Sequence, residues 1–426
     1  MSDKKPSPQV GGNDRQRDIY IAGARAKKPL VPIDFSEMEK AAAKKISLRA
    51  NAYIAGGAGN EESVLSNRSD FSRWRIIPRM LRNVSERDTS VELFGKKLDH
   101  PFLLSPIGVL ELAHQQADLA VAKAAAANNI PMIFSNQASR SMEECAGAMG
   151  EADRWFQLYW SKSDELVASL VKRAENCGCK AIVVTLDTTM LGWRTRDLDL
   201  AYLPFMEGKG IAQYTSDPVF LKMLDEPMEQ TASGPINIAA IKTLIKMTKA
   251  FPGSFMQNLR SGLPRKAVQK FIQIYSRPSL TWENLEFLRG ITGLPILLKG
   301  ILHRDDARKA LDYGLDGIIV SNHGGRQVDG SISSIAALPD VVEIIDNKIP
   351  VLLDSGIRGG ADVFKALALG ATAVCIGRPY VYGLALAGEV GVDEVLKNFQ
   401  ADFELTMGLS GCKGVAEISR DCLVRA

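Results

Sequence analysis

The stretch that decides the fold is VLLDSGIRGGADVFKALALGATAVCIGRP, residues 351–379. It begins with the apolar run VLLD (residues 351–354) and ends with the apolar run AVCIG (residues 373–377). Both runs have the length and composition of buried strands, and the residues between them have helical spacing. This order predicts two parallel neighbouring strands joined by a helix.

Six similar apolar runs precede this stretch, and a helical segment follows each of them. They are residues 102–106, 132–135, 155–159, 181–185, 296–299 and 317–321. With one exception, successive runs begin at intervals close to the ~30 residues of a βα unit. The eight runs therefore predict an α/β protein built as a closed (β/α)8 TIM barrel. An open, doubly wound sheet is the alternative.

The exceptional interval lies between the fourth and fifth runs, from about residue 188 to about residue 293. It far exceeds an ordinary βα loop and predicts an insertion over about residues 200–280, with helix between residues 236 and 274. Such a loop suits a lid and, equally, a surface excursion or an oligomer contact. An N-terminal helical extension with a helix over residues 35–53 precedes the barrel. We expect residues 1–18 to form a disordered tail and residues 19–426 to form one domain.

Composition excludes several classes of function. The chain has 426 residues, 46% of them hydrophobic, and its 52 Lys and Arg residues nearly balance 49 Asp and Glu residues. The net charge of +3 gives no support to binding of nucleic acid or a membrane surface, and no run of ~20 apolar residues predicts a membrane span. Six cysteines without paired spacing predict neither metal binding nor disulfides, which fits a cytoplasmic protein with small-molecule partners.

Polar side chains gather where the apolar runs end. In a TIM barrel these carboxyl ends form the catalytic face, so the density of polar groups predicts a ligand site. The residues concerned are Ser135, Gln157, Tyr159, Thr185, Asp187, Lys299, Ser321, Asn322, His323, Asp354, Gly377 and Arg378.

The last two strand ends carry the pattern of a phosphate site. Asp354, Gly356 and Arg358 follow the seventh run, and Gly377 and Arg378 follow the eighth. Glycines let backbone N–H groups approach a phosphate, and arginines add positive charge. A phosphorylated substrate is one candidate ligand. The donors and acceptors around the rest of the mouth, on Ser135, Gln157, Thr185 and Lys299, favour a flat heterocycle joined to the phosphate, which describes FMN.

Histidine is scarce, and one histidine follows directly on a strand end. This is His323, within SNHGGRQVD (residues 321–329), where Arg326 comes three residues later. A histidine titrates near neutral pH, so the pattern predicts a general base beside a cation. The alternative is a structural histidine in a turn, which is the default interpretation for the other three histidines.

Four segments resemble one known family. They are LLKGIL (297–302), SNHGGRQVD (321–329), DSGIRGGADVFKALALGA (354–371) and IGRPYVYGLA (376–385). The chain resembles the FMN-dependent 2-hydroxy-acid oxidase and dehydrogenase family from about residue 33 to about residue 423. LSNRSDFSRWRIIPRML (65–81), LGWRTRDLDLAYLPF (191–205) and GIAQYTSDPVF (210–220) are similar to the lactate 2-monooxygenase branch of that family.

The resemblance implies a role for each matching residue. His323 takes the substrate proton while two electrons pass to FMN, and Asp187 holds its imidazole. Arg194 and Arg326 bind the substrate carboxylate. Arg196, two residues after Arg194, is the less favoured alternative to Arg194. Tyr53 and Tyr159 hydrogen-bond the carboxylate or hydroxyl group. The residues implied to contact FMN are Pro106, Ile107, Gly108, Ser135, Gln157, Thr185, Lys299, Ser321, Asp354, Gly356, Arg358, Gly377 and Arg378.

The resemblance also implies the reaction, with alternatives. Gly108 replaces the alanine of many members and removes a methyl group beside the flavin, which fits oxidation of L-lactate by O2 to acetate, CO2 and water. The nearest alternative is a 2-hydroxy-acid oxidase that releases a 2-oxo acid and hydrogen peroxide. A dehydrogenase with a quinone or cytochrome acceptor, a non-redox phosphate-binding isomerase or synthase and a non-catalytic flavin-binding protein are further alternatives. Family members form tetramers and octamers, so a homo-oligomer is expected.

Overall fold

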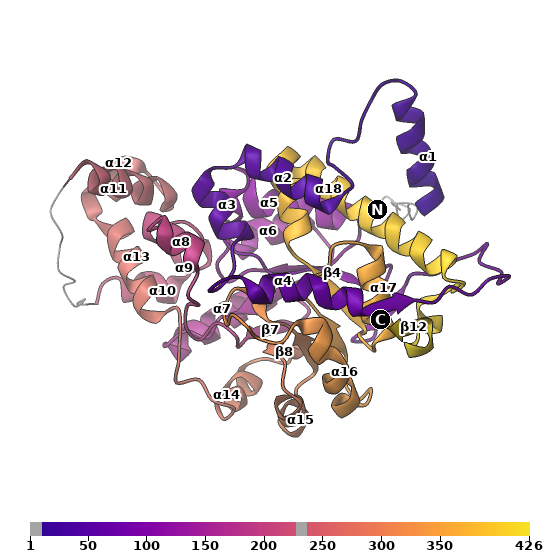
Figure 1. Cartoon of the computed structure of the whole chain (residues 1–426). Coiled ribbons are helices and arrows are strands. Elements are labelled where there is room, and N and C mark those ends of the chain that lie inside the picture. Colours follow the sequence, from indigo (N-terminus) through magenta and orange to yellow (C-terminus); the bar gives the residue numbers. More distant parts are fainter. Residues whose placement is uncertain (1–10, 227–236) are drawn as a thin grey trace, which may run out of the picture.

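The centre of the fold is a barrel of parallel strands. The computed structural model describes residues 11–226 and 237–426, and eight strands close in the order β10, β11, β4, β5, β6, β7, β8, β9. Their bounds are β4 (Phe102–Leu104), β5 (Met132–Phe134), β6 (Arg154–Leu158), β7 (Ile182–Thr185), β8 (Ile296–Ile301), β9 (Gly317–Val320), β10 (Val351–Leu353) and β11 (Ala373–Ile376). Each strand coincides with one of the apolar runs, so the predicted TIM barrel is confirmed (Figure 1).

The inside of the barrel is a packed core. Alternate strand residues point inward and form one apolar cluster, which includes Leu103, Ile133, Trp155, Val183, Leu297, Ile319, Leu352 and Cys375. Their neighbours along the strands, such as Phe102 and Leu104, belong to the larger cluster between strands and helices. A hairpin of β2 (Val91–Leu93) and β3 (Lys96–Leu98) adds Leu93 and Leu98 to the inner cluster and closes the amino-terminal end. Only the opposite end is left for a site.

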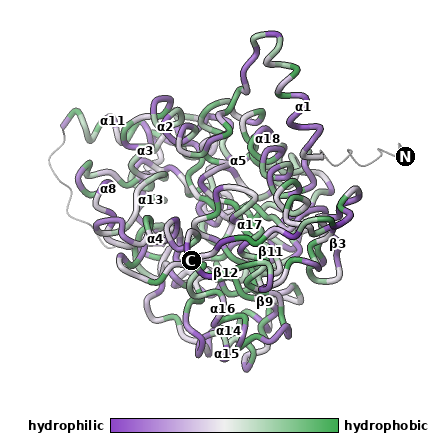
Figure 2. Tube along the Cα trace, turned by 45° about the vertical axis from the view of Figure 1, so that its right-hand side comes forward, coloured by the Kyte–Doolittle hydropathy of each residue, from purple (hydrophilic) through white to green (hydrophobic). Residues whose placement is uncertain are grey.

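Amphipathic helices cover the outside of the barrel. They are α5 (Ala117–Ala127), α6 (Met142–Met149), α7 (Asp164–Asn176), α14 (Asn284–Ile291), α15 (Arg304–Asp312), α16 (Ser334–Ile345), α17 (Gly360–Ala368) and α18 (Arg378–Leu409). Hydrophobic and hydrophilic segments alternate along these helices because one face packs on the strands (Figure 2). The backbone of α18 leaves helical geometry at Ala387 and Gly388, so it consists of two helical pieces.

The N-terminal extension differs from the prediction in two places. Residues 1–10 of the expected tail lie outside the described residues, but α1 (Gly12–Gly23) is helical, and its Arg15 donates to Asn398 of α18 at 2.9 Å. Disorder up to residue 18 was therefore the wrong expectation. The helix expected over residues 35–53 is two helices, α2 (Phe35–Lys45) and α3 (Leu48–Ala55), because Ile46 is extended and the Ser47 hydroxyl caps α3.

The fourth helix of the N-terminal extension reaches the carboxyl end of the barrel. This helix, α4 (Glu62–Ser69), contacts the short helix η4 (His323–Gly325) that follows β9. Further along the chain, η1 (Asp70–Arg73) leads to β1 (Trp74–Ile76), which pairs antiparallel with β12 (Leu423–Arg425). This pairing joins the segment that precedes the barrel to the last residues of the chain.

The insertion is present between β7 and β8, as predicted. It contains α8 (Thr195–Asp199), η3 (Pro204–Glu207), α9 (Ala212–Thr215), α10 (Pro218–Met223), α11 (Ile238–Ala250), α12 (Phe255–Ser261) and α13 (Leu263–Ile274). Phe271 makes an edge-on contact with Tyr214 and a stacked contact with Tyr275, at 4.8 and 4.9 Å between ring centroids, and these contacts hold the insertion together. In Figure 1 α10 to α13 gather at one side of the barrel. Within the described ranges, no helix is long and apolar enough to cross a membrane.

Candidate active site

A buried lysine stands at the centre of the carboxyl end of the barrel. The Lys299 ammonium on β8 donates to the Ser321 hydroxyl at 2.8 Å, and it lies 3.2 Å from the Asp354 carboxylate and 3.8 Å from the Asp187 carboxylate. Burial alone would lower the pKa of Lys299, but the two carboxylates raise it above its ordinary value. The lysine is therefore a permanent positive charge in the site.

The position of Asp187 depends on a glycine in β8. The strand has a register irregularity between Lys299 and Ile301, and Gly300 between them has a φ of +107°. A Cβ atom at Gly300 would lie 2.9 Å from the Asp187 Cβ. Any other residue would be strained there and would push Asp187 away, so Gly300 lets this carboxylate reach both Lys299 and His323.

The imidazole of His323 is held on one side by the Asp187 carboxylate. Its Nδ1 lies 2.7 Å from Asp187 Oδ1, and the Thr188 hydroxyl donates to the same carboxylate oxygen at 3.0 Å. Burial would raise the pKa of Asp187, but its interactions with His323 and the charge of Lys299 lower it to about 2. An ionised Asp187 accepts a hydrogen bond from the Nδ1–H of His323. The proton therefore stays on Nδ1, and Nε2 is the free basic nitrogen.

The loop that carries His323 is held by a pair of asparagines. His323 has a φ of +57°, which is strained for a residue with a side chain. The loop packs against α4. The side-chain amides of Asn67 on α4 and Asn322 on the loop donate hydrogen bonds to one another, at 2.7 and 2.9 Å. Both side chains are buried. Sequence analysis missed Asn67, because nothing in its local pattern shows that α4 packs on this loop.

Two arginines face the same tyrosine ring. The Arg326 and Arg194 guanidinium groups lie 5.0 and 5.9 Å from the centroid of Tyr53. Arg326 donates to the Tyr53 and Gly56 carbonyls at 2.5 and 2.7 Å, and burial and Arg194 together lower its pKa. Two guanidinium groups this close repel one another unless an anion lies between them. Arg196, the second choice, instead pairs with Glu61 and does not line the cavity.

The residues of the predicted phosphate site, which follow β10 and β11, line the same cavity. Arg358 is half-buried, its buried Nε–H has no acceptor within the described ranges, and Arg378 and Arg68 lower its pKa in addition to burial. Gly356 has a φ of +91°, and a Cβ there would collide with the Asn67 carbonyl. An incompletely bonded arginine beside a glycine turn fits a phosphate, which would satisfy the Nε–H and neutralise the charge.

Most of the predicted residues line one cavity, and the others lie directly beneath it. The lining includes Tyr53, Pro106, Ile107, Gly108, Tyr159, Arg194, Lys299, His323, Arg326, Asp354, Gly356, Arg358, Gly377 and Arg378. Asp187, Ser135, Gln157, Thr185 and Ser321 are not in the lining. The Gln157 amide donates to Thr185 at 3.0 Å and accepts from Ser135 at 3.1 Å, so this chain of polar groups fixes the floor of the cavity.

The wall of the cavity includes residues of the insertion. Leu191 lines the cavity together with Phe205 and Tyr275, which lie within the insertion. Leu110 is instead buried in the core and Trp193 is 72% exposed, so neither belongs to this wall. A Cβ at Gly108 would lie 2.8 Å from the Gln137 carbonyl, so the glycine lets the Gln137 backbone approach closely and leaves no extra space on that side.

Comparison with known proteins agrees with this geometry. Residues 42–425 match the family described as FMN-dependent dehydrogenase. L-lactate oxidase of Lysinibacillus sphaericus is 40% identical over 413 residues, which cover 97% of this chain and 98% of that protein. The chain belongs to the FMN-dependent 2-hydroxy-acid oxidase and dehydrogenase family.

Other members of this family are equally informative. Human 2-hydroxyacid oxidase 1 is 40% identical over 368 residues, which cover 86% of this chain and 90% of that protein. The crystal structure of mandelate oxidase with (S)-4-hydroxymandelic acid superposes with a TM-score of 0.76 at 34% identity, covering 92% of this chain and 98% of that one. This family member is therefore an FMN-dependent oxidoreductase that acts on 2-hydroxy acids, and Arg358, Gly356 and Lys299 fit the phosphate and ring of FMN.

The phosphate end can be tested with two flavins. In Arg358→Gln we expect the apoprotein to bind FMN about 10- to 100-fold more weakly, because a charge-assisted contact to the phosphate is lost. Binding of riboflavin, which has no phosphate, should change little. Quenching of flavin fluorescence on titration measures both affinities. Arg260→Gln, on α12 and outside the cavity lining, is the control. Equal weakening for both flavins would contradict the assignment of Arg358 to the phosphate.

Proposed function

We propose that the protein is a lactate 2-monooxygenase, which converts L-lactate and O2 to acetate, CO2 and water. The observation that carries this proposal is the apolar and aromatic lining that the chain between β7 and β8 adds to the cavity of the arginine pair. Phe205, which is 2% exposed, Tyr275 and Leu191 line the same cavity as Arg194 and Arg326 and reduce its size. A short 2-hydroxy acid fits such a wall, and a product formed behind it is slow to leave.

The arginine pair binds and orients the substrate in this proposal. Arg194 and Arg326 hold the carboxylate with charge-assisted hydrogen bonds, since their fork geometry matches a carboxylate. Tyr53, under both guanidinium groups, and Tyr159, buried beside the cavity floor, supply hydroxyl groups for the substrate. Burial and the charge of Asp187 raise the pKa of Tyr159, so it donates a hydrogen bond as a neutral phenol.

His323 removes the substrate proton in this proposal. Burial lowers the pKa of His323, while Asp187 opposes this effect, so the imidazole is neutral before the reaction and can accept a proton on Nε2. Asp187, 2.7 Å from Nδ1, stabilises the imidazolium that forms. FMN, held at Lys299, Gly356 and Arg358, would supply the two-electron redox chemistry that links oxidation of the substrate to reduction of O2. Lys299, the buried cation, favours accumulation of negative charge next to it.

Retention of both products completes the proposed reaction. Oxidation of lactate gives pyruvate and hydrogen peroxide. If the insertion keeps both in the cavity, peroxide adds to the keto carbon of pyruvate, and cleavage of the O–O and C–C bonds releases CO2, acetate and water.

A second candidate is a 2-hydroxy-acid oxidase that releases the 2-oxo acid and peroxide. The names of the relatives, L-lactate oxidase and 2-hydroxyacid oxidase 1, favour this outcome. Both candidates use the same residues for the first oxidation. They differ only in whether the insertion retains pyruvate until peroxide has reacted.

The proposed base predicts the pH dependence. Burial lowers the pKa of His323 below 6.5, the ordinary pKa of histidine. We therefore expect kcat/KM for lactate to fall on the acid side only below pH 6.5. In Asp187→Asn the carboxylate that raises this pKa is lost. We expect its acid limb to move to still lower pH and kcat/KM to drop about 100-fold or more, because the imidazolium is no longer stabilised. Stopped-flow reduction of the flavin measures both. An acid limb that moves to higher pH in Asp187→Asn would contradict this role.

Product analysis decides between the two candidates. We expect one acetate and one CO2 per O2 consumed with L-lactate, and little free peroxide, measured by NMR of the products and a peroxidase-coupled assay. Addition of catalase should leave the acetate yield unchanged, since the peroxide reacts before release. Stoichiometric pyruvate and peroxide would contradict the monooxygenase proposal and support the oxidase.

A further inference from the structure

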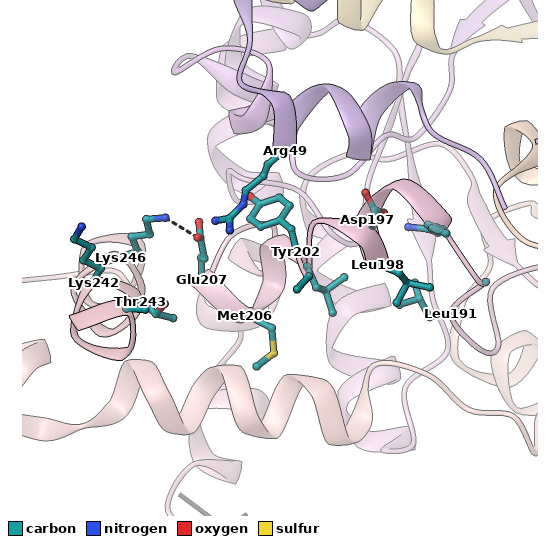
Figure 3. Close-up of a pocket in the computed structure, with 15 residues that line it drawn as sticks. Arg49, Leu191, Asp197, Leu198, Tyr202, Met206, Glu207, Lys242, Thr243 and Lys246 are labelled. Carbon is teal, nitrogen blue, oxygen red and sulfur yellow. Dashed lines mark hydrogen bonds and ion pairs between the residues drawn. The ribbon is translucent and has the colours of Figure 1, made fainter. Parts of the chain in front are cut away.

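A second cavity adjoins the active site and is not used by the reaction described above. It has a volume of about 470 Å3 and lies between α3, α8, η3 and α11 (Figure 3). Its lining is Arg49, Leu191, Gly192, Arg194, Asp197, Leu198, Ala201, Tyr202, Leu203, Met206, Glu207, Ala239, Lys242, Thr243 and Lys246. Two of these residues, Leu191 and Arg194, also line the active-site cavity. The two cavities are thus neighbours that share a wall.

One face of α11 supplies lysines to this outer cavity. Ala239, Lys242, Thr243 and Lys246 follow helical spacing, and Figure 3 shows the last three on the same side of the cavity. Lys246 pairs with Glu207 at 2.6 Å, and Lys209 pairs with the same carboxylate at 3.2 Å. Lys242 has no ion-pair partner in the described part of the chain. Its charge is therefore free to attract an anion.

Arg49 supplies a second free cation from the opposite side. Its guanidinium lies 5.2 Å above the Tyr202 ring, and no carboxylate in the described segments pairs with it. Four cationic side chains, Arg49, Arg194, Lys242 and Lys246, face two carboxylates, so the lining has an excess of two positive charges. Asp197, one of the two, is 7% exposed and interacts with Arg194 and Arg326. It does not neutralise Arg49 or Lys242.

The cations form a path that leads inward. Lys242 and Arg49 face the outer cavity, Arg194 borders both cavities, and Arg326 lies in the inner one. Between them Leu198, Leu203 and Met206 offer an apolar surface for a short carbon chain. We propose that the outer cavity is an access chamber, in which a small carboxylate binds near Arg49 and Lys242 before it passes Leu191 and Arg194. The chamber serves the substrate of the proposed function and rests on that proposal.

The charge of the chamber can be tested through the rate of ligand binding. Oxalate is a small carboxylate that is not a 2-hydroxy acid, and stopped-flow absorbance of the bound flavin follows its arrival in the holoenzyme. In Lys242→Glu we expect the association rate constant to fall about three- to tenfold at low ionic strength, and the loss to shrink at about 0.5 M salt. Lys222→Glu, on the exposed part of α10 and outside both cavities, is the matched control and should bind oxalate at the wild-type rate.

The space in the chamber can be tested without changing its charge. Ala239 lines the chamber, and its exposed neighbour Ala240 on α11 lines neither cavity. We expect Ala239→Trp to slow both association and dissociation of oxalate several-fold with little change in Kd, because it obstructs the path and leaves the inner site intact. Ala240→Trp should match the wild type.

Two outcomes would contradict the proposal that the outer cavity is an access chamber. One is wild-type rates in Ala239→Trp, and the other is equal slowing in Lys242→Glu and Lys222→Glu, which would show a general effect of surface charge. Failure of the proposed function is seen separately. It follows from the products that the wild-type enzyme forms, whereas the oxalate rates do not depend on those products.

Discussion

The site depends on one buried charge network, in which Lys299 lies between Asp187 and Asp354 and Asp187 in turn holds His323. A lysine that is 3% exposed would be strongly destabilising without these carboxylates. Its charge keeps Asp187 ionised, and the ionised Asp187 fixes which nitrogen of His323 carries the proton. The geometry of β8 makes this network possible, because Gly300 has no side chain and Asp187 can therefore pack directly against the strand.

Around this network, the described part of the chain holds arginines that form no ion pair. Arg358, at the proposed phosphate end, and Arg326, at the proposed substrate end, are both half-buried, and burial lowers the pKa of each. Such groups reduce the stability of the folded chain until anions bind them. FMN and a carboxylate substrate therefore contribute to the stability of this end of the barrel as well as to its chemistry.

Much of this arrangement could be predicted from sequence, because strand ends are local features. Each apolar run became a strand, and the carboxyl end of every such strand faces the same mouth, so Gln157, Lys299 and Asp354 had to meet. Contacts between distant segments could not be predicted in this way. Asn67 reaches Asn322 only through the packing of α4, and Phe205 and Tyr275 reach the cavity only through the fold of the insertion. The break at Ile46 was missed because the alanines and lysines before it and Leu48, Arg49 and Ala50 after it all favour helix.

The central claim is that Asp187 holds His323 as a neutral base whose proton lies on Nδ1. Nitrogen NMR of the holoenzyme labelled with 15N-histidine tests this claim directly, since the chain has four histidines and comparison with His323→Gln assigns the signal. At pH 7 we predict a protonated Nδ1 and an unprotonated Nε2 for His323. A proton on Nε2 with a bare Nδ1, or a fully protonated imidazolium, would contradict the account.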